Sequence, residues 1–168
     1  MFNFHSAFLN GQLDEDKEVF MEQLPGYEES DLQKYCVKLY KSLYGLKQAR
    51  CKWYEIVCRT LAELGFKKCE ADQAVFFIHA RKVILILAIH VDDCTMTGSS
   101  DDLIQNYKLK IKSKYDLTDL GPIHWLLGLK ITRDCENSTI SLSQSSFPNH
   151  PISTHSLGDL ILQTSDLV

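Results

Sequence analysis

The stretch that decides the fold is residues 83–98, which run Val83-Ile84-Leu85-Ile86-Leu87-Ala88-Ile89-His90-Val91-Asp92-Asp93-Cys94-Thr95-Met96-Thr97-Gly98. Residues 83–91 are almost all apolar, which predicts a β-strand that is buried on both faces. Two adjacent aspartates end this run, and a second short strand is expected from Cys94 to Thr97, before the breaker Gly98. The pattern therefore predicts a β-hairpin of the core with two carboxylates at its tip.

The two aspartates allow two interpretations. Two carboxylates a few ångströms apart resist joint ionisation, so this pair is costly unless a cation compensates it. A divalent metal, and through it phosphate chemistry, is one interpretation. The other is a solvated type I′ turn, where aspartate is common for conformational reasons. The hairpin tip alone does not decide between them.

Length and charge set the first limits on the class of protein. A chain of 168 residues suits one domain with a real hydrophobic core. Its formal charge of −4 argues against a protein that coats nucleic acid by bulk electrostatics. The charge is unevenly distributed, since residues 14–31 are strongly acidic and residues 34–68 are basic. The basic segment is suited to a phosphate backbone, but it is equally typical of a solvated surface.

The cysteine pattern predicts an intracellular protein. The six cysteines show no CxxC pairing, and no secretory signal precedes them. They indicate reduced thiols, which places the protein in the cytoplasm or the nucleus. The apolar run 83–91 is too short to cross a bilayer, so no membrane partner is expected.

Hydrophobic periodicity predicts the remaining elements as a mixture of strands and two helices. Strands are expected within 1–9, 18–23, 35–39, 74–79 and 83–91, and a closing hairpin is expected from 125–132 and 139–142. A helix should follow residues 42–49 and end near Leu64, where Gly65 suits a C-terminal cap. A second helix should begin at Ser100-Asp101-Asp102. Trp53 and Trp125 are interpreted as core residues, with base stacking as the alternative.

Six short motifs, in order and at family spacing, resemble the reverse transcriptase domain of copia-type LTR retrotransposons. The resemblance runs from the first residues to about Ser146. The motifs are Ser6-Ala7-Phe8-Leu9-Asn10-Gly11, Val19-Phe20-Met21-Glu22-Gln23, Lys41-Ser42-Leu43-Tyr44-Gly45-Leu46-Lys47-Gln48-Ala49, Trp53-Tyr54, Val91-Asp92-Asp93 and Asp119-Leu120-Gly121-Pro122.

This resemblance implies an α+β fold, namely the palm of an RNA-directed DNA polymerase. In such a palm, two main helices pack on one face of an antiparallel sheet. Three carboxylates there hold two Mg²⁺ ions for nucleotidyl transfer, because Mg²⁺ prefers acidic oxygen ligands. Asp92 and Asp93 match two of these metal ligands. The implied partners are an RNA or DNA primer–template, a dNTP and other parts of a retrotransposon polyprotein.

The third carboxylate position of the family falls on Asn3, five residues before the aromatic Phe8. An amide is neutral and offers one carbonyl oxygen, so it cannot bridge two cations as a carboxylate does. The loss of a bridging ligand is expected to slow the reaction by roughly 10³-fold or more. The sequence therefore predicts a chain that does not polymerise DNA, although its ancestry is enzymatic.

Other site residues are implied by the resemblance alone. Phe8 matches the aromatic that excludes a 2′-hydroxyl, with a core phenylalanine as the alternative. Gly45, Lys47 and Gln48 match a loop that approaches template and nucleotide, or they form a plain loop that leads into the helix. Arg50 stands where the family often has proline or glycine. His90 is a candidate primer contact or a packed strand residue, and Leu127-Gly128 resembles the hairpin that grips the primer.

The resemblance also predicts what the chain lacks. A fingers segment is expected before the strand of Asn3, and a thumb after the closing hairpin, and neither is found. Residues 1–146 are therefore predicted to be a truncated palm. Residues 147–168 are predicted to be a poorly ordered or divergent tail with, at best, a short helix near 157–162. The alternative function is a non-catalytic module that binds nucleic acid or protein and retains the palm fold.

Overall fold

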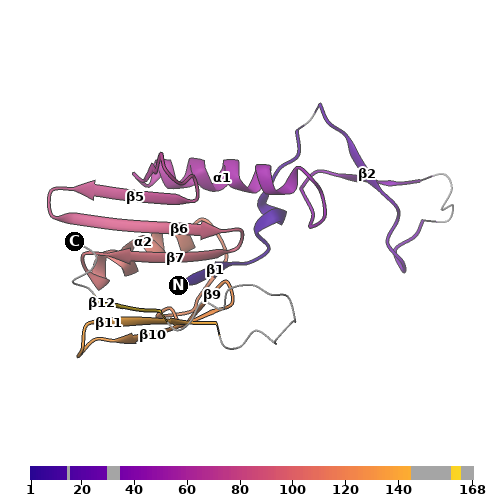
Figure 1. The fold of residues 1–168 in the computed structure, drawn as a ribbon. Coiled ribbons are helices and arrows are strands. Elements are labelled where there is room, and N and C mark those ends of the chain that lie inside the picture. Colours follow the sequence, from indigo (N-terminus) through magenta and orange to yellow (C-terminus); the bar gives the residue numbers. More distant parts are fainter. Residues whose placement is uncertain (15, 30–34, 145–159, 164–168) are drawn as a thin grey trace. The chain divides into compact units, whose positions relative to one another are not determined.

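The computed structural model describes residues 1–14, 16–29, 35–144 and, for the backbone alone, 160–163. The chain divides into two compact units, Met1–Asp119 and Leu120–Val168, where the composition alone suggests one domain. Both units are built on antiparallel strands, and the two α-helices belong to the first (Figure 1). The architecture is thus mixed α and β, as predicted. No helix among the described residues is long and apolar enough to cross a membrane.

The first unit contains a six-stranded antiparallel sheet in the order β4-β5-β6-β7-β1-β8. Strands β5, β6 and β7 form an antiparallel meander in one half of the sheet, and β4 is the edge strand beside β5. In the other half, the short strand β1 pairs with β7, and β8 pairs with β1. The bounds are β1 (Phe2–Phe4), β4 (Lys67–Lys68), β5 (Val75–Ala80), β6 (Val83–His90), β7 (Asp93–Gly98) and β8 (Leu117–Asp119).

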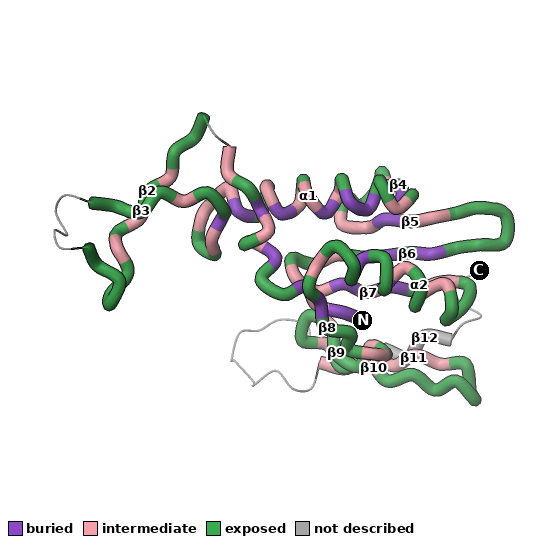
Figure 2. The backbone as a smooth tube through the Cα atoms, turned by 180° about the vertical axis from the view of Figure 1, so that it is seen from behind, coloured by how far each residue is buried: buried purple, intermediate pink, exposed green. Residues whose placement is uncertain are grey.

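Both α-helices pack on the same face of this sheet. The helices are α1 (Ala49–Glu63) and α2 (Asp101–Lys112). Figure 2 shows buried positions of α1 alternating with exposed ones, as expected for a helix that buries a single stripe. The buried side chains of helices and strands form one cluster: Phe2, Phe4, Ala7, Trp53, Val57, Leu61, Phe66, Phe76, Leu85, Leu87, Cys94, Met96, Ile111 and Leu117.

The ends of both helices follow the signals in the sequence. The hydroxyl of Ser100 accepts a hydrogen bond from the backbone N–H of Leu103, which caps α2 as predicted. After α1, Gly65 has φ +90°, and the N–H of Phe66 donates to the carbonyl of Leu61. This is the Schellman arrangement, in which glycine adopts the left-handed conformation without strain. It turns the buried Phe66 back onto the core.

The prediction that residues 83–91 are buried on both faces is wrong. Leu85 and Leu87 are buried under the helices, whereas Ile84 is 47% exposed and Ile86 is 39% exposed. The alternation of the pleat places these isoleucines on the opposite face. Among the described residues of the first unit, only one face of the sheet bears helices, and an apolar run does not encode whether a second layer exists.

A short helix and a two-stranded ribbon separate β1 from α1. The 3₁₀ helix η1 (Ala7–Asn10) follows β1, and β2 (Val19–Met21) pairs with β3 (Val37–Leu39). The two strands lie within the ranges predicted for them. The N–H of Ser42 donates to the carbonyl of Gly11, so the chain returns beside η1 before α1 begins.

The second unit is a four-stranded antiparallel sheet in the order β12-β11-β10-β9. Its strands are β9 (Trp125–Leu126), β10 (Leu129–Asp134), β11 (Thr139–Ser143) and β12 (Leu160–Gln163). The hairpin β10–β11 confirms the predicted closing hairpin, but a turn at Leu127-Gly128 divides its first strand. Leu127 (φ +50°) and Gly128 (φ +82°) are both left-handed, which is the conformation of a type I′ turn.

Two further predictions in this unit are wrong. Trp125 was expected in the core but is 48% exposed, because no α-helix among the described residues of the second unit covers its sheet. Residues 160–162 were expected in a short helix, yet they pair with β11 as part of β12. Extended pairing suits the apolar, partly β-branched Leu160-Ile161-Leu162 segment. The boundary predicted at residue 146 lies outside the described residues, as do residues 157–159 and most of the predicted tail. The division into a palm of residues 1–146 and a tail of residues 147–168 therefore stays a prediction.

Candidate functional site

The tip of the β6–β7 hairpin has a strained backbone and is held by a hydrogen bond from a core side chain. Val91 and Asp92 connect the strands, and His90 pairs with Asp93 across them. Val91 has φ +57°, a conformation that β-branched residues rarely adopt. Its carbonyl accepts a hydrogen bond of 2.8 Å from Nε1 of Trp53, a side chain only 2% exposed. Strained backbone that is held this firmly is typical of functional sites.

Strand β1 brings Asn3 directly opposite Asp93. The two residues are partners in the β1–β7 register, so their side chains share the face of the sheet away from the helices. Nδ2 of Asn3 donates a hydrogen bond of 2.8 Å to Oδ1 of Asp93. The resemblance assigns Asn3 and Asp93 to one site, and the structure brings them together from positions 90 residues apart in the chain.

Asp92 is contacted by a residue that the sequence analysis did not single out. The hydroxyl of Tyr44 donates a hydrogen bond of 2.9 Å to Oδ2 of Asp92. Partial desolvation, and then the hydrogen bond with this carboxylate, raise the pKa of the Tyr44 phenol, so it remains a donor at neutral pH. The other oxygen, Oδ1 of Asp92, is buried and has no hydrogen-bond partner among the described residues.

The loop before α1 positions Tyr44 beside Phe8. Their ring centroids are 4.7 Å apart, and Phe8 is half-buried. The buried hydroxyl of Ser42 donates to the carbonyl of Phe8, which fixes the loop against η1. Gly45 follows with φ +94°, a left-handed turn that suits glycine. Phe8 and the loop of Tyr44 are therefore neighbours of the carboxylate pair.

The remaining candidate residues lie in the loop before α1, at the end of β6 and in the second unit. Lys47 is exposed in the loop, and Gln48 stands at the start of α1 without capping it through its side chain. His90 is exposed and is the cross-strand neighbour of Asp93. Leu127 and Gly128 form a turn of the second unit, so the structure does not place them against the carboxylates.

An apolar pocket of about 400 Å³ lies under the same hairpin tip. It opens between the first half of α1 and the ends of β5 and β6. Such a volume is in the range of small-molecule sites, which are mostly apolar. Its lining residues are Phe8, Arg50, Cys51, Trp53, Tyr54, Val57, Gln73, Ala74, Ile89 and Val91.

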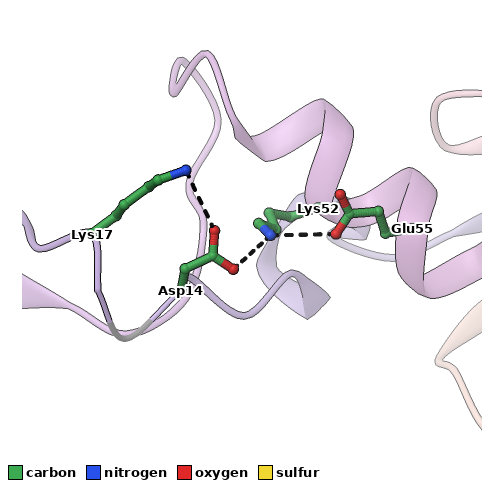
Figure 3. Close-up of polar contacts among 4 residues, drawn as sticks. All are labelled: Asp14, Lys17, Lys52 and Glu55. Atoms are coloured by element: carbon green, nitrogen blue, oxygen red, sulfur yellow. Dashed lines mark hydrogen bonds and ion pairs between the residues drawn. The ribbon is translucent and has the colours of Figure 1, made fainter.

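A second group of charged residues lies where the segment after η1 meets α1 (Figure 3). Nζ of Lys52 is 2.7 Å from Oδ1 of Asp14 and 3.3 Å from Oε2 of Glu55. Lys17 lies 4.0 Å from the other oxygen of Asp14. The hydrogen bond from Lys52 lowers the pKa of Asp14 against the opposing effect of desolvation, and the charges of Lys52 and Lys17 add to the lowering. We call these four residues the Asp14 cluster.

The chain belongs to the reverse transcriptase (RNA-dependent DNA polymerase) family, which it matches over residues 1–164. This confirms the predicted resemblance, and the match extends beyond its expected end at residue 146. Reverse transcriptases generally use divalent metal ions, and the tip of β6–β7 carries the two adjacent carboxylates of Asp92 and Asp93.

The relatives are proteins of retrotransposons. The chain is 36% identical, over 84% of its length, to a retrovirus-related Pol polyprotein from transposon TNT 1-94 of Nicotiana tabacum. It is 34% identical over 77% of its length to the Pol polyprotein from transposon RE1 of Arabidopsis thaliana, and 32% identical over 82% to a putative transposon Ty5-1 protein of Saccharomyces cerevisiae. The chain spans 11%, 9% and 44% of these relatives. No solved structure matches it.

The donor set at the tip does not fit a pair of Mg²⁺ ions bridged by three carboxylates. The third position holds the neutral amide of Asn3, whose N–H faces Asp93. No group of three His, Cys, Asp or Glu side chains suited to a metal occurs in the part of the chain that the structure describes. One feature remains favourable to a cation, namely the unpartnered Oδ1 of Asp92. The tip thus combines two carboxylates, the amide of Asn3 and the phenol of Tyr44.

Proposed function

We propose that this chain is the palm part of a retrotransposon RNA-directed DNA polymerase and that, as it stands, it does not polymerise DNA. The observation that carries the proposal is the pairing of Asn3 with Asp93, where the family resemblance implies a carboxylate on each strand. The arrangement of two helices on one face of an antiparallel sheet is consistent with a palm. The proposed location is the cytoplasm or the nucleus.

The physical reason for inactivity is the charge of the site. Two carboxylates and an amide carry one negative charge fewer than three carboxylates. An amide also offers a single oxygen, so it cannot bridge two Mg²⁺ ions. We expect a loss of roughly 10³-fold or more in rate relative to a site with aspartate at position 3.

The substrates follow from the family and are part of the proposal. A primer–template and a dNTP would lie over the open face of the sheet, near Asp93 and His90. Phe8, Gly45, Lys47 and Gln48 would approach the nucleotide and template, and Leu127-Gly128 would approach the primer. The chain spans about a tenth of the polyproteins from tobacco and Arabidopsis. We propose that fingers, thumb and other partners come from such a polyprotein.

Primer extension tests this proposal in two formats. The chain is assayed alone with Mg²⁺, and it also replaces the corresponding segment of the tobacco Pol polyprotein. Each format is made with the natural sequence and with Asn3→Asp. We expect extension from the polyprotein that contains Asn3→Asp and a rate at least roughly 10³-fold lower from the one that contains Asn3. Equal rates would contradict the role assigned to Asn3.

The alternative, a non-catalytic binding module built on the basic residues 34–68, has less support. Lys38 and Lys52 of this segment are paired with Glu18 and Asp14 of the acidic segment. Part of the contrast in charge is therefore neutralised within the chain. Strongly salt-dependent binding of the chain to a primer–template duplex would favour this alternative.

A further inference from the structure

We propose that two neutral donors, the amide of Asn3 and the phenol of Tyr44, hold the Asp92–Asp93 pair in place of a divalent cation. The hairpin tip would then fold and persist without metal. This inference concerns the same carboxylates as the proposed function and rests on it, but its test measures stability and metal binding instead of polymerisation.

The first step of the argument is the contact between β1 and β7. Asn3 and Asp93 are directly opposed, and their side chains are joined by a bond of 2.8 Å. A carboxylate at position 3 would face a second carboxylate at this distance, and the two would repel unless a cation lay between them. The amide N–H of Asn3 replaces that repulsion with a charge-assisted hydrogen bond.

The second step concerns Asp92. Its Oδ2 accepts the hydrogen bond from Tyr44, whose ring is held by Phe8. A tyrosine phenol is neutral near pH 7, so this donor brings no charge to Asp92. Each aspartate therefore has its own neutral donor, and the two donors come from different elements of the first unit.

The third step is the lack of a built-in counter-charge. Among the described residues, no Lys, Arg or His nitrogen lies within 4.0 Å of either carboxylate. Hydrogen bonds from Asn3 and Tyr44 are consequently the stabilising contacts of these side chains. A cation at the free Oδ1 of Asp92 would still lack a third acidic ligand.

Thermal unfolding of the full chain tests the inference, with EDTA, MgCl₂ or MnCl₂ present. We expect the melting temperature of the natural chain to be the same in all three to within about 1 °C. Asn3→Asp should melt lower in EDTA, because it adds a like charge, and should gain about 4 °C when Mn²⁺ nearly saturates the new site. If this variant is unfolded in EDTA, recovery of its circular dichroism on addition of Mn²⁺ is the equivalent result.

Asn3→Ala is the matched control, because it removes the hydrogen bond without adding a charge. It should melt lower than the natural chain and should not respond to metal. Electron paramagnetic resonance of Mn²⁺ gives a direct readout, with binding expected for Asn3→Asp and not for the natural chain or Asn3→Ala.

Two results would overturn the inference. One is stabilisation of the natural chain by Mn²⁺ as large as that of Asn3→Asp, and the other is an Asn3→Asp variant that ignores metal. The first, together with failed primer extension, would leave the proposed function standing. Primer extension by the natural polyprotein would overturn that function whatever the melting temperatures are.

Discussion

The hairpin tip and the Asp14 cluster are both rich in carboxylates, but their partners differ. Asp14 has the ammonium of Lys52 at 2.7 Å, and its pKa is lowered by that contact. Asp92 and Asp93 have neutral donors, and one oxygen of Asp92 has none among the described residues. Asp14 is therefore held by a charged partner, whereas Asp92 and Asp93 are held by hydrogen bonds from neutral side chains.

The largest expected difference in stability is between substitutions of two adjacent residues of α1, namely Trp53, which holds the tip, and Lys52, which belongs to the Asp14 cluster. Trp53→Ala should destabilise the chain by about 3–5 kcal/mol, because it opens a cavity in the core and removes the hydrogen bond to Val91. Lys52→Ala should have a much smaller effect, because the partners of Lys52 are solvated. Urea unfolding followed by circular dichroism measures both. A loss at Lys52 equal to that at Trp53 would contradict this comparison.

A smaller effect is expected from relieving the strain at the tip. Val91→Gly should stabilise the chain by about 1 kcal/mol, because glycine adopts φ +57° without the steric cost of a β-branched residue. Val83 is a matched control, since it is 38% exposed and Val91 is 36% exposed, but its φ is not positive. Val83→Gly should destabilise the chain in the same unfolding assay. The same sign for both variants would argue against strain at Val91.

The smallest effect concerns the pH dependence of the Asp14 cluster. Because the folded pKa of Asp14 is lowered, its contribution to stability is present above the unfolded pKa of about 3.9 and is lost as pH falls through the folded value. The stability difference between the natural chain and Asp14→Asn should therefore be constant near neutral pH and should shrink in acid. Unfolding curves recorded between neutral pH and pH of about 3 measure this trend, and a difference that stays constant over the whole range would contradict it.

Local signals in the sequence predicted most of the first unit. Three such signals are the apolar stripe of α1, Gly65 after it and Ser100 before α2. Each depends only on residues close to it in the chain, so it can be recognised without a structure. The exposure of Ile84 and of Trp125 could not be predicted in this way. Burial depends on layers contributed by distant segments, and an apolar residue looks the same whether or not such a layer is present.

Only those residues of the candidate site that the family motifs specify were predicted from the sequence. Asn3 and Asp93 were assigned to one site from the family pattern, and the register confirms that they are neighbours. Tyr44 was missed although it lies within a quoted motif. Its contact with Asp92 spans 48 residues and depends on the left-handed turn at Gly45 and on the bond from Ser42 to Phe8. No periodicity or spacing rule encodes that geometry.

The position of β1 between β7 and β8 has a consequence for the time course of folding. Residues 2–4 find their partners only at 93–94 and 117–119, so this strand is synthesised long before its partners and is among the last to pair. The α1 helix and the β5–β6 hairpin have local contacts and should form early, whereas β1 must wait for a large loop to close. On the ribosome, the sheet would remain open until Asp119 has left the exit tunnel.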